Sequence, residues 1–488
     1  MTVPRGTEFT DENIQRLFGY EDAESESIER LREYYFKNET FARVVSDLPI
    51  RVLVGHKGIG KSALFKISMA EDLEKGNLPI LIKPDDIAEL GKENDNFLLT
   101  IRQWKNGLNK IIGTKVFNEF GITDNNVINK LSNFSLKLIS YIADSVTTVK
   151  DKINLTPSQE LIMDNFLKKR KIIIYIDDLD RGWEGKKEDI NRLSALLNSI
   201  RDLASESPGL CFKVSLRSDV YFLVRTSDES TDKIEGSVVW YSWTNHEILI
   251  MLIKRVLTYF GQDFNESNLL TTSQHHLSFY LDDIMEHRFQ GYGKWENKAM
   301  YKILMSLIRK RPRDLVKLCS LAGREAYRAK ARIIRTDHFK NIFEEYSQGR
   351  IQDTINEYRT ELPNIDKLIF GMKPSKKEKL TADGFVFTTS ELHLKLNHLI
   401  GQNRYIFANN KTATAQDLAH FLYKINFLTA RKVLQDGEID RKYFEENRYL
   451  SNSSANFGYD WEIHPAYRWA LQPDTIEDIF AKLALSAD

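Results

Sequence analysis

The stretch that decides the fold is "RVLVGHKGIGKSALFKIS", which runs from Arg51 to Ser68. It reads as an apolar strand, a glycine-punctuated turn and a helix that opens on Lys61 and Ser62. The glycines at 55, 58 and 60 allow positive φ and bring backbone N–H groups close to phosphate oxygens, where they add to the positive end of the helix dipole. The pattern therefore predicts a phosphate-binding loop between a strand and a helix.

In this loop the lysine is expected to reach the β- and γ-phosphates of a nucleotide, and the serine to offer its hydroxyl to Mg²⁺. The alternative is a glycine-rich turn that contains an incidental lysine. The residues predicted to bind ATP here are Gly55, His56, Lys57, Gly58, Ile59, Gly60, Lys61, Ser62 and Ala63. Lys61 is also predicted to be catalytic.

A phosphate loop predicts a second buried strand that ends in acid, because the metal needs carboxylates and the attacking water needs orienting. "KIIIYIDDLDRGW" supplies it, with five apolar residues from Ile172 to Ile176. Asp177 is the predicted Mg²⁺ carboxylate, and Asp178 is the predicted base that polarises water. The alternative is that these acids cap the next helix, a role that fits Asp180 better.

A third buried strand, "LCFKVSLRSDVYF", runs from Leu210 towards Leu216 and ends at Arg217. Ligands of open parallel sheets lie outside the carboxyl ends of the strands, so Arg217 is expected at the same edge as the phosphate loop. It is a predicted catalytic sensor of the γ-phosphate, and a salt-bridged structural arginine is an alternative of near-equal weight. Arg181 is a weaker candidate for the same charge.

The helical spacing and turn residues predict four parts. These are an N-terminal helical segment (1–46), a core (47–240) with a helical insertion at about 85–170, a helical lid (241–350) and a C-terminal domain (351–488). The N-terminal segment is expected to form two helices, roughly 10–18 and 22–46. The lid is expected to contain a helix within Ser242–Gly261 and then three helices, the middle one starting at Pro312.

A basic cluster lies where that middle helix starts, and it contains Arg309, Lys310, Arg311 and Arg313. One interpretation is a solvated helix end, because the dipole favours basic residues at the preceding C-terminus. The other is that Arg313 folds back over the nucleotide and senses its γ-phosphate. Both stay open at this point.

The C-terminal part combines helices with short strands. "TAQDLAHFLYKINFLTAR" looks like one helix, "KVLQDGEID" like a strand with an Asp-Gly turn, and "YDWEIHPAYRWAL" like a strand ended by His464-Pro465. Helices followed by a two-stranded ribbon predict a winged helix-turn-helix. The preceding link "KPSKKEKLT" is interpreted as a solvated connector rather than a nucleic-acid arm.

Composition limits the other function classes. Sixty-nine basic residues balance sixty-nine acidic ones, so no global field attracts nucleic acid or a membrane. The two cysteines, Cys211 and Cys319, lack metal-type spacing, which predicts no zinc site or disulfide framework and suits a reducing compartment. No leader or membrane-spanning run is recognised, so a cytoplasmic location without a membrane partner is expected.

Together, these motifs resemble the AAA+/STAND side of the P-loop ATPases, and "IDDLDR" is also similar to the KAP-type ATPases. The combination resembles bacterial stand-alone ATPases over roughly residues 15–350, with a weaker likeness in the winged-helix region. The resemblance implies an α/β P-loop NTPase core with a parallel sheet flanked by helices, a helical lid and a C-terminal winged-helix-like α+β domain. It also implies ATP and Mg²⁺ as cofactors, with Arg217 and Arg313 as first and second sensors.

Two departures limit this transfer. Asp178 stands where many AAA+ proteins have glutamate, which resembles slowly hydrolysing STAND switches, and the core insertion is polar where KAP proteins often carry membrane segments. The leading hypothesis is an ATP-hydrolysing regulatory switch that acts through a homo-oligomer or a partner effector, with a role in antiphage defence implied by the resemblance. The alternatives are a DNA-binding initiator or loader, and a scaffold that holds nucleotide without hydrolysing it.

Overall fold

The computed structural model describes residues 5–91, 96–122, 138–150, 155–227, 229–375, 378, 384–435, 438–448, 450 and 458–472. The chain divides into two compact units. The parallel-sheet unit comprises Lys37–Lys57 and Lys61–Tyr241, and the C-terminal unit comprises Met1–Phe36, Gly58–Gly60 and Ser242–Asp488. Each unit is described separately below.

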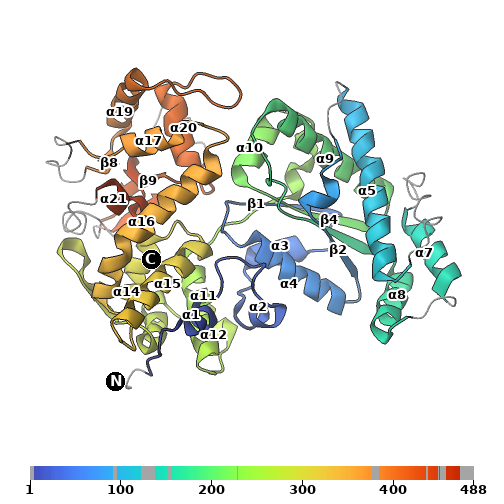
Figure 1. The fold of residues 1–488 in the computed structure, drawn as a ribbon, viewed down its shortest axis with the longest axis horizontal. Coiled ribbons are helices and arrows are strands. Elements are labelled where there is room, and N and C mark those ends of the chain that lie inside the picture. The colour runs from blue at the N-terminus through green and yellow to red at the C-terminus, as the bar shows by residue number, and fades with distance from the viewer. Residues whose placement is uncertain are drawn as a thin grey trace. The chain divides into compact units, whose positions relative to one another are not determined.

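The parallel-sheet unit is built on five strands in the order β2-β3-β4-β1-β5. Figure 1 labels β1, β2 and β4 of this sheet. All four pairings are parallel. The strands are β1 (Ile50–Val54), β2 (Leu78–Ile82), β3 (Ile172–Ile176), β4 (Leu210–Leu216) and β5 (Val238–Trp240). Every residue of β3 and β4 is buried, as expected for inner strands of a sheet covered on both faces. The strand predicted at Ile172–Ile176 is confirmed, whereas β5 was not predicted.

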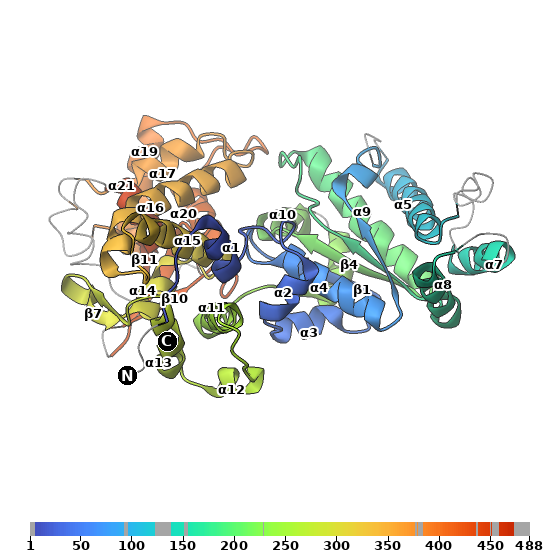
Figure 2. The same cartoon turned by 60° about the horizontal axis from the view of Figure 1, so that its bottom comes forward.

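Helices cover both faces of this sheet, with α3 and α4 on one face and α5 and α9 on the other (Figure 2). The helices are α3 (Glu39–Val45), α4 (Lys61–Glu74), η1 (Pro84–Ile87), α5 (Phe97–Glu119), α7 (Leu138–Val149), α8 (Pro157–Lys169), α9 (Lys187–Glu206), α10 (Ser218–Ser227) and η4 (Glu229–Ser237). On the α5 and α9 face, Ile174 and Phe212 share one apolar cluster with Trp104 and Leu196. The P-loop NTPase core and its parallel sheet are confirmed.

A buried ion pair fixes α4 on the opposite face. Lys213 Nζ of β4 lies 3.1 Å from Asp72 Oδ2 of α4 and donates to the hydroxyls of Tyr175 at 2.9 Å and Ser68 at 3.1 Å. Burial lowers the pKa of Lys213, and Asp72 opposes that shift. Because an uncompensated buried charge is costly, this cluster favours a single position for the helix that begins at Lys61.

The C-terminal unit begins with α1 (Asp11–Phe18) and α2 (Ile28–Tyr34), both packed on α11 (Asn245–Tyr259). The remaining helices up to residue 371 are α12 (Glu266–Thr271), α13 (Gln274–Leu277), η5 (Ser278–Asp283), η6 (Gly293–Trp295), α14 (Met300–Leu307), α15 (Pro312–Arg328), α16 (Thr336–Tyr358) and α17 (Ile365–Gly371). The helix start predicted at Pro312 is confirmed. A short hairpin of β6 (Arg288–Gln290) and β7 (Glu296–Ala299) was not predicted.

The helix expected over 22–46 is two helices, α2 and α3, in the structure. Ser27 caps α2 by accepting from Arg30 N, and Asn38 caps α3 by accepting from Phe41 N. Asn38 begins a second helix because its side chain accepts from the N–H of Phe41, which has no partner inside the first turn of that helix.

The last part of this unit is a four-stranded antiparallel sheet in the order β10-β9-β11-β8, with helices packed beside it. Its elements are β8 (Val386–Phe387), α19 (Thr389–Gln402), α20 (Ala415–Lys424), β9 (Leu428–Val433), β10 (Ile439–Lys442), β11 (Asp460–Ile463), η7 (Pro465–Tyr467) and α21 (Arg468–Leu471). The winged-helix-like α+β architecture is therefore confirmed, whereas the predicted two-stranded ribbon is wrong, because β8 and β11 extend the β9–β10 pair to four strands. The lysine link lies partly outside the described residues.

One helix predicted in this region is wrong in its length. Thr414–Arg431 was expected to be a single helix, but α20 ends at Lys424 and the chain re-enters as β9. Asn426 adopts φ 57°, a left-handed conformation that ends helices and that asparagine tolerates. Apolar residues continue across this boundary, so periodicity alone did not reveal it.

A buried charge network joins α15, α16 and η7. Arg309 donates to both oxygens of Asp314 at 2.7 and 2.9 Å, and Arg350 donates to the same carboxylate at 2.6 Å. Arg309 also donates to the hydroxyls of Tyr467 at 2.8 Å and Thr354 at 3.2 Å. Burial alone would raise the pKa of Asp314, but Arg309 and Arg350 outweigh it and hold that pKa well below its usual range.

A second buried network lies inside the antiparallel sheet. Arg441 of β10 donates to both oxygens of Glu462 of β11 at 2.8 and 3.2 Å, and Arg468 also donates to this carboxylate. Burial acts to raise the pKa of Glu462, but the two guanidinium groups lower it to about 2. The ionised carboxylate therefore stabilises the fold above pH ~4.5, and this contribution is lost as the pH falls towards about 2.

We expect Glu462→Gln to lower the free energy of unfolding by about 3–5 kcal/mol at pH 7, because two buried guanidinium groups lose their counter-charge. The difference from wild type should narrow as the pH falls below 4.5, since the wild-type carboxylate is then protonated more readily in the unfolded chain. Urea unfolding followed by circular dichroism from pH 7 to pH 3 measures this. Glu345→Gln, at an exposed position of α16, is the control and should track wild type. A difference independent of pH would contradict the assignment.

Candidate functional site

The predicted site residues follow three neighbouring strands at their carboxyl ends. Val54, the last residue of β1, pairs with Leu216, the last residue of β4, and Ile176, the last residue of β3, pairs with Val214. The loop after β1, Asp177 after β3 and Arg217 after β4 therefore begin at one edge of the sheet. This is the edge at which open parallel sheets bind their ligands.

The phosphate loop forms the strand–turn–helix unit that the sequence predicts. Gly58 has φ +79° and Gly60 has φ +104°, both in the left-handed region that favours glycine. Gly55 is not among the residues with positive φ, so the expectation for that glycine was wrong. Helix α4 begins at Lys61, which places Lys61, Ser62 and Ala63 in its first turn, where backbone N–H groups lack helical partners.

Side chains of the loop are held by the loop itself and by α10. Lys61 Nζ donates to the carbonyl oxygens of Gly55 at 2.8 Å and His56 at 3.2 Å. The buried ring of His56 places Nδ1 3.0 Å from Ser218 Oγ, next to Arg217 in sequence. Lys57 is exposed. The ammonium of Lys61 is thus kept over the loop, where P-loop chemistry requires a phosphate-binding cation.

The acidic strand end is anchored by β4. Asp177 Oδ1 accepts from the hydroxyl of Ser215 and from the backbone N–H of Asp178 at 3.0 Å. Asp178 is exposed and has φ 63°, an uncommon conformation for a residue other than glycine. The next helix, α9, has Lys186 as its N-cap residue, so neither acid caps it. Sequence reasoning missed Ser215, although its position two residues before Arg217 is visible in the strand.

Arg217 is buried and bound to two carboxylates. Its guanidinium donates to Asp219 at 2.5 and 3.0 Å and lies 3.4 Å from Asp180. These contacts match the alternative interpretation of Arg217 as a salt-bridged structural arginine. They also place the positive charge of Arg217 at the sheet edge, beside Asp180. Asp180 therefore forms an ion pair with Arg217, and it does not cap α9.

Arg313 belongs to the C-terminal unit, in the first turn of α15. Gly58–Gly60 belong to this unit as well, and Arg313 N donates to Gly58 O at 3.3 Å. The Arg313 side chain donates from Nε to Glu21 O at 2.9 Å, and Trp243 Nε1 donates to Ile59 O at 2.8 Å. Arg313 is thus in contact with the backbone of Gly58 within this unit.

Ser62 and Asp177 are the candidate Mg²⁺ ligands at this edge of the sheet. Among the described residues, no group of three or more His, Cys, Asp or Glu side chains could hold a metal ion. Ser62 and Asp177 offer one hydroxyl and one carboxylate, and Mg²⁺ at such sites takes its remaining ligands from phosphate oxygens and water.

In the part of the chain that the structure describes, no helix is long and apolar enough to cross a membrane.

We expect Gly58→Ala to lower the free energy of unfolding by about 1–2 kcal/mol, because alanine must hold a left-handed φ. The added Cβ would also lie 3.1 Å from Cβ and Cδ of Arg313. ATP affinity should fall about tenfold or more if the loop shifts by a comparable free energy. Thermal unfolding and titration calorimetry measure both effects.

The matched control is Gly349→Ala in α16, where an added Cβ meets nothing within 4 Å. This change should raise stability by roughly 0.5–1 kcal/mol, because glycine is unfavourable inside a helix. Equal effects of the two substitutions would contradict the loop geometry.

No family model matches this chain. Among known proteins it is similar to the "Putative transposon gamma-delta 80.3 kDa protein" of Escherichia coli (strain K12). The two are 22% identical over 513 residues, which cover 95% of this chain and 69% of that protein.

Three solved structures are similar to this chain at low identity. The Walker-type ATPase PABY2304 of Pyrococcus abyssi has a TM-score of 0.41 at 12% identity, covering 90% of this chain and 96% of that one. The ORC2 protein of Aeropyrum pernix, in ADPNP and ADP complexes, has a TM-score of 0.41 at 10% identity, covering 98% and 95%. The ORC1 protein of Aeropyrum pernix, in complex with DNA, has a TM-score of 0.34 at 13% identity, covering 95% and 97%.

Proposed function

We propose that this protein binds Mg²⁺–ATP and hydrolyses its γ-phosphate bond. The observation that carries the proposal is the placement of the loop after β1, with Lys61 in the first turn of α4, at the same sheet edge as Asp177 and Asp178. Backbone N–H groups of a helix N-terminus and a lysine bind phosphates, and carboxylates serve the metal and the attacking water.

Within this proposal, Ser62 and Asp177 hold Mg²⁺, and Asp178 orients the attacking water. The hydrogen bond from Ser215 supports this division of roles, because it fixes one oxygen of Asp177 while Asp178 stays exposed. Bound Mg²⁺ supplies charge neutralisation on the phosphates. The chain's own contribution is to position the phosphates and exclude alternative geometries.

The two arginines are proposed to sense the γ-phosphate by different routes. Arg217 is already paired with Asp180 and Asp219. To contact the γ-phosphate, its guanidinium must therefore give up a contact with one of these carboxylates. Arg313 contacts the loop backbone at Gly58, so it can respond to the loop's conformation.

The buried network around Asp314 supports a regulatory role for the C-terminal unit. Asp314 lies next to Arg313, and Arg309 joins that carboxylate to Tyr467 at the end of the antiparallel sheet. If the start of α15 moves, we expect the winged-helix-like region to move with it, because breaking the buried ion pair between Arg309 and Asp314 is costly. We propose that nucleotide state is passed to a partner in this way. A STAND-type or KAP-type mechanism, homo-oligomer assembly and an antiphage role stay predictions of the resemblance.

Two substitutions test hydrolysis. Lys61→Ala should abolish ATP binding, whereas Asp178→Asn should keep binding and lose at least about 100-fold in turnover, a typical value for removing a general base. Lys75→Ala, at an exposed site just after α4, is the control and should behave as wild type. Equilibrium dialysis with ATP and Mg²⁺ measures binding, and phosphate release measures turnover.

Unchanged ATP binding by Lys61→Ala would contradict the proposed site. ATP bound by wild type without any phosphate release would instead support a scaffold that holds nucleotide as a structural ligand.

A second candidate function is an ATPase that acts on DNA. It is favoured by the winged-helix-like sheet together with the similarity to a putative transposon protein over 95% of this chain. The zero net charge requires any DNA contact to be local.

If DNA is the partner, a labelled duplex should bind with an affinity that falls steeply between 50 and 200 mM salt, by roughly 10³-fold for six phosphate contacts. Replacing Lys373, Lys376, Lys377 and Lys379 by alanine should weaken binding and flatten the salt dependence. Fluorescence anisotropy measures both. Absence of binding at low salt would remove DNA as the partner.

A further inference from the structure

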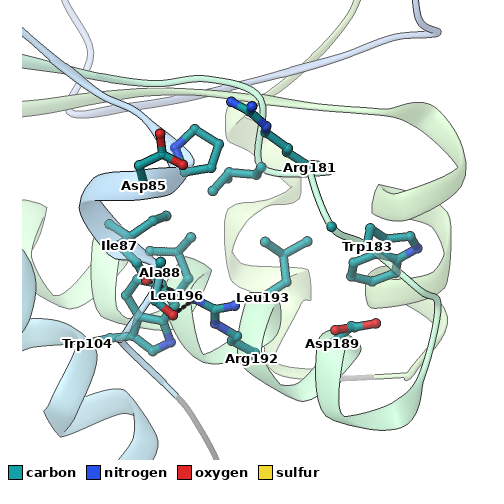
Figure 3. A pocket seen from close by; sticks show the side chains of 13 residues that line it. Asp85, Ile87, Ala88, Trp104, Arg181, Trp183, Asp189, Arg192, Leu193 and Leu196 are labelled. Carbon is teal, nitrogen blue, oxygen red and sulfur yellow. Dashed lines mark hydrogen bonds between the residues drawn. The ribbon is translucent and has the colours of Figure 1, made fainter.

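A cavity of about 260 Å³ lies inside the parallel-sheet unit, between η1, α5, α9 and the segment that follows Asp178 (Figure 3). None of the proposed ATP-binding residues lines it. Its lining residues are Pro84, Asp85, Ile87, Ala88, Trp104, Leu179, Arg181, Gly182, Trp183, Asp189, Arg192, Leu193 and Leu196. Of the candidates for the nucleotide site, Arg181 alone, the weaker candidate for sensing the γ-phosphate, also lines this cavity.

The cavity is held open by contacts of its own walls. Arg192 of α9 donates to the carbonyl oxygens of Ile87 at 2.8 Å, Ala88 at 3.1 Å and Leu90 at 2.9 Å. Its guanidinium also lies 5.6 Å from the ring centroid of the buried Trp104. These bonds tie the segment after η1 to α9, so the space between them is part of the folded structure.

Apolar side chains line the middle of the cavity, and charged side chains lie towards both of its ends. Ile87, Leu193 and Leu196 are buried, and Leu179 is half-buried. Figure 3 shows the side chains of Asp85 and Arg181 at one end of the cavity, away from Trp104 and Arg192. An apolar interior with a few polar groups at its edge is the usual composition of a ligand site.

The four charged groups differ in what they already bind. Arg192 already donates hydrogen bonds to carbonyl oxygens. Asp189 Oδ2 accepts from the backbone N–H groups of Glu184 at 3.0 Å and Lys186 at 3.2 Å. Asp85 and Arg181 are exposed, and neither side chain has a hydrogen bond or ion pair with another described residue. One donor and one acceptor at the mouth are thus available to a ligand.

These features decide the class of ligand. Two aspartates balance two arginines, so the cavity has no excess positive charge for a phosphate or a nucleic acid. Its volume is below the roughly 300–1,000 Å³ typical of cofactor pockets, and suits one large side chain. A peptide backbone carries a C=O and an N–H beside every side chain, which complement Arg181 and Asp85.

We propose that this cavity is a docking site for one aromatic or large aliphatic side chain from an extended segment of a partner protein. The anchor side chain packs against Leu179, Leu193 and Leu196, and the half-exposed ring of Trp183 covers its edge. A single buried anchor within a polar rim is how many protein interfaces concentrate their binding energy.

The cavity also lies next to the proposed hydrolytic residue. Arg181 N donates to Asp178 O at 2.9 Å and Trp183 N donates to Asp180 O at 3.1 Å, so one wall is a turn that starts at Asp178. Asp180 in the same turn contacts Arg217. A docked side chain therefore restrains the segment that carries Asp178, and the partner regulates turnover; this second part rests on the proposed function.

The test fills the cavity without removing any of its packing. Ala88 is exposed and lines the cavity, so Ala88→Trp places an indole where the anchor would lie. Asn191→Trp, at an exposed position of α9 outside the lining, is the matched control. The probe is a phage-displayed library of random linear 12-residue peptides, selected on the full chain without nucleotide.

Selected peptides should share one aromatic or large aliphatic residue. Their affinity should fall at least about tenfold for Ala88→Trp, for Arg181→Asp, or when the shared residue is replaced by alanine, as expected for an interface anchor. Asn191→Trp should bind as wild type. Arg181→Asp keeps the test decisive if the tryptophan disturbs folding.

A selection without such a shared residue, or peptides that bind Ala88→Trp and Asn191→Trp equally, would overturn the docking site. Turnover is measured separately with saturating peptide, which should change the rate of wild type at least about fivefold, in line with typical coupling energies, and leave the rate of Ala88→Trp unaffected. Binding without a change in rate would overturn the regulatory part. Absence of turnover in every variant would contradict the proposed ATPase while leaving the docking result intact.

Discussion

The parallel pairing of β1, β4 and β3 is the constraint on which the rest of the site depends. Val54 lies opposite Leu216, and Ile176 lies opposite Val214, so three loops leave the sheet at one edge. Any antiparallel pairing among these strands would send one of the loops to the other edge. The hydrogen bond between Ser215 and Asp177 joins two of the strand ends, and the ion pair of Lys213 with Asp72 fixes the helix that follows the loop.

The fold was predictable wherever a pattern is local. Ile172–Ile176 is uniformly apolar and followed by acid, and the glycines and Lys61 form a compact motif, so both elements matched the structure. Errors arose where a single residue overrode periodicity, as at Asn426 and Asn38. The carboxylate partners of Arg217 and the cavity at Ala88 depend on contacts between distant segments, which a spacing pattern does not contain.

Buried ion networks recur where elements of one unit meet. In the parallel-sheet unit, Lys213 and Asp72 join β4 to α4. In the C-terminal unit, Asp314 binds Arg309 and Arg350, which joins α15 to α16. Such pairs add little net stability, but removing one partner is costly because it leaves a buried charge without compensation. We propose that this coupling carries the effect of bound nucleotide from one element to the next.

We propose that the sheet edge that carries Lys61, Asp177 and Asp178 cleaves ATP. A single-turnover experiment with γ-labelled ATP, Mg²⁺ and the full chain in excess measures this cleavage. Labelled phosphate should be released with first-order kinetics, and chelation of Mg²⁺ should stop the release. Recovery of intact ATP after prolonged incubation with protein that binds it would contradict hydrolysis at this site.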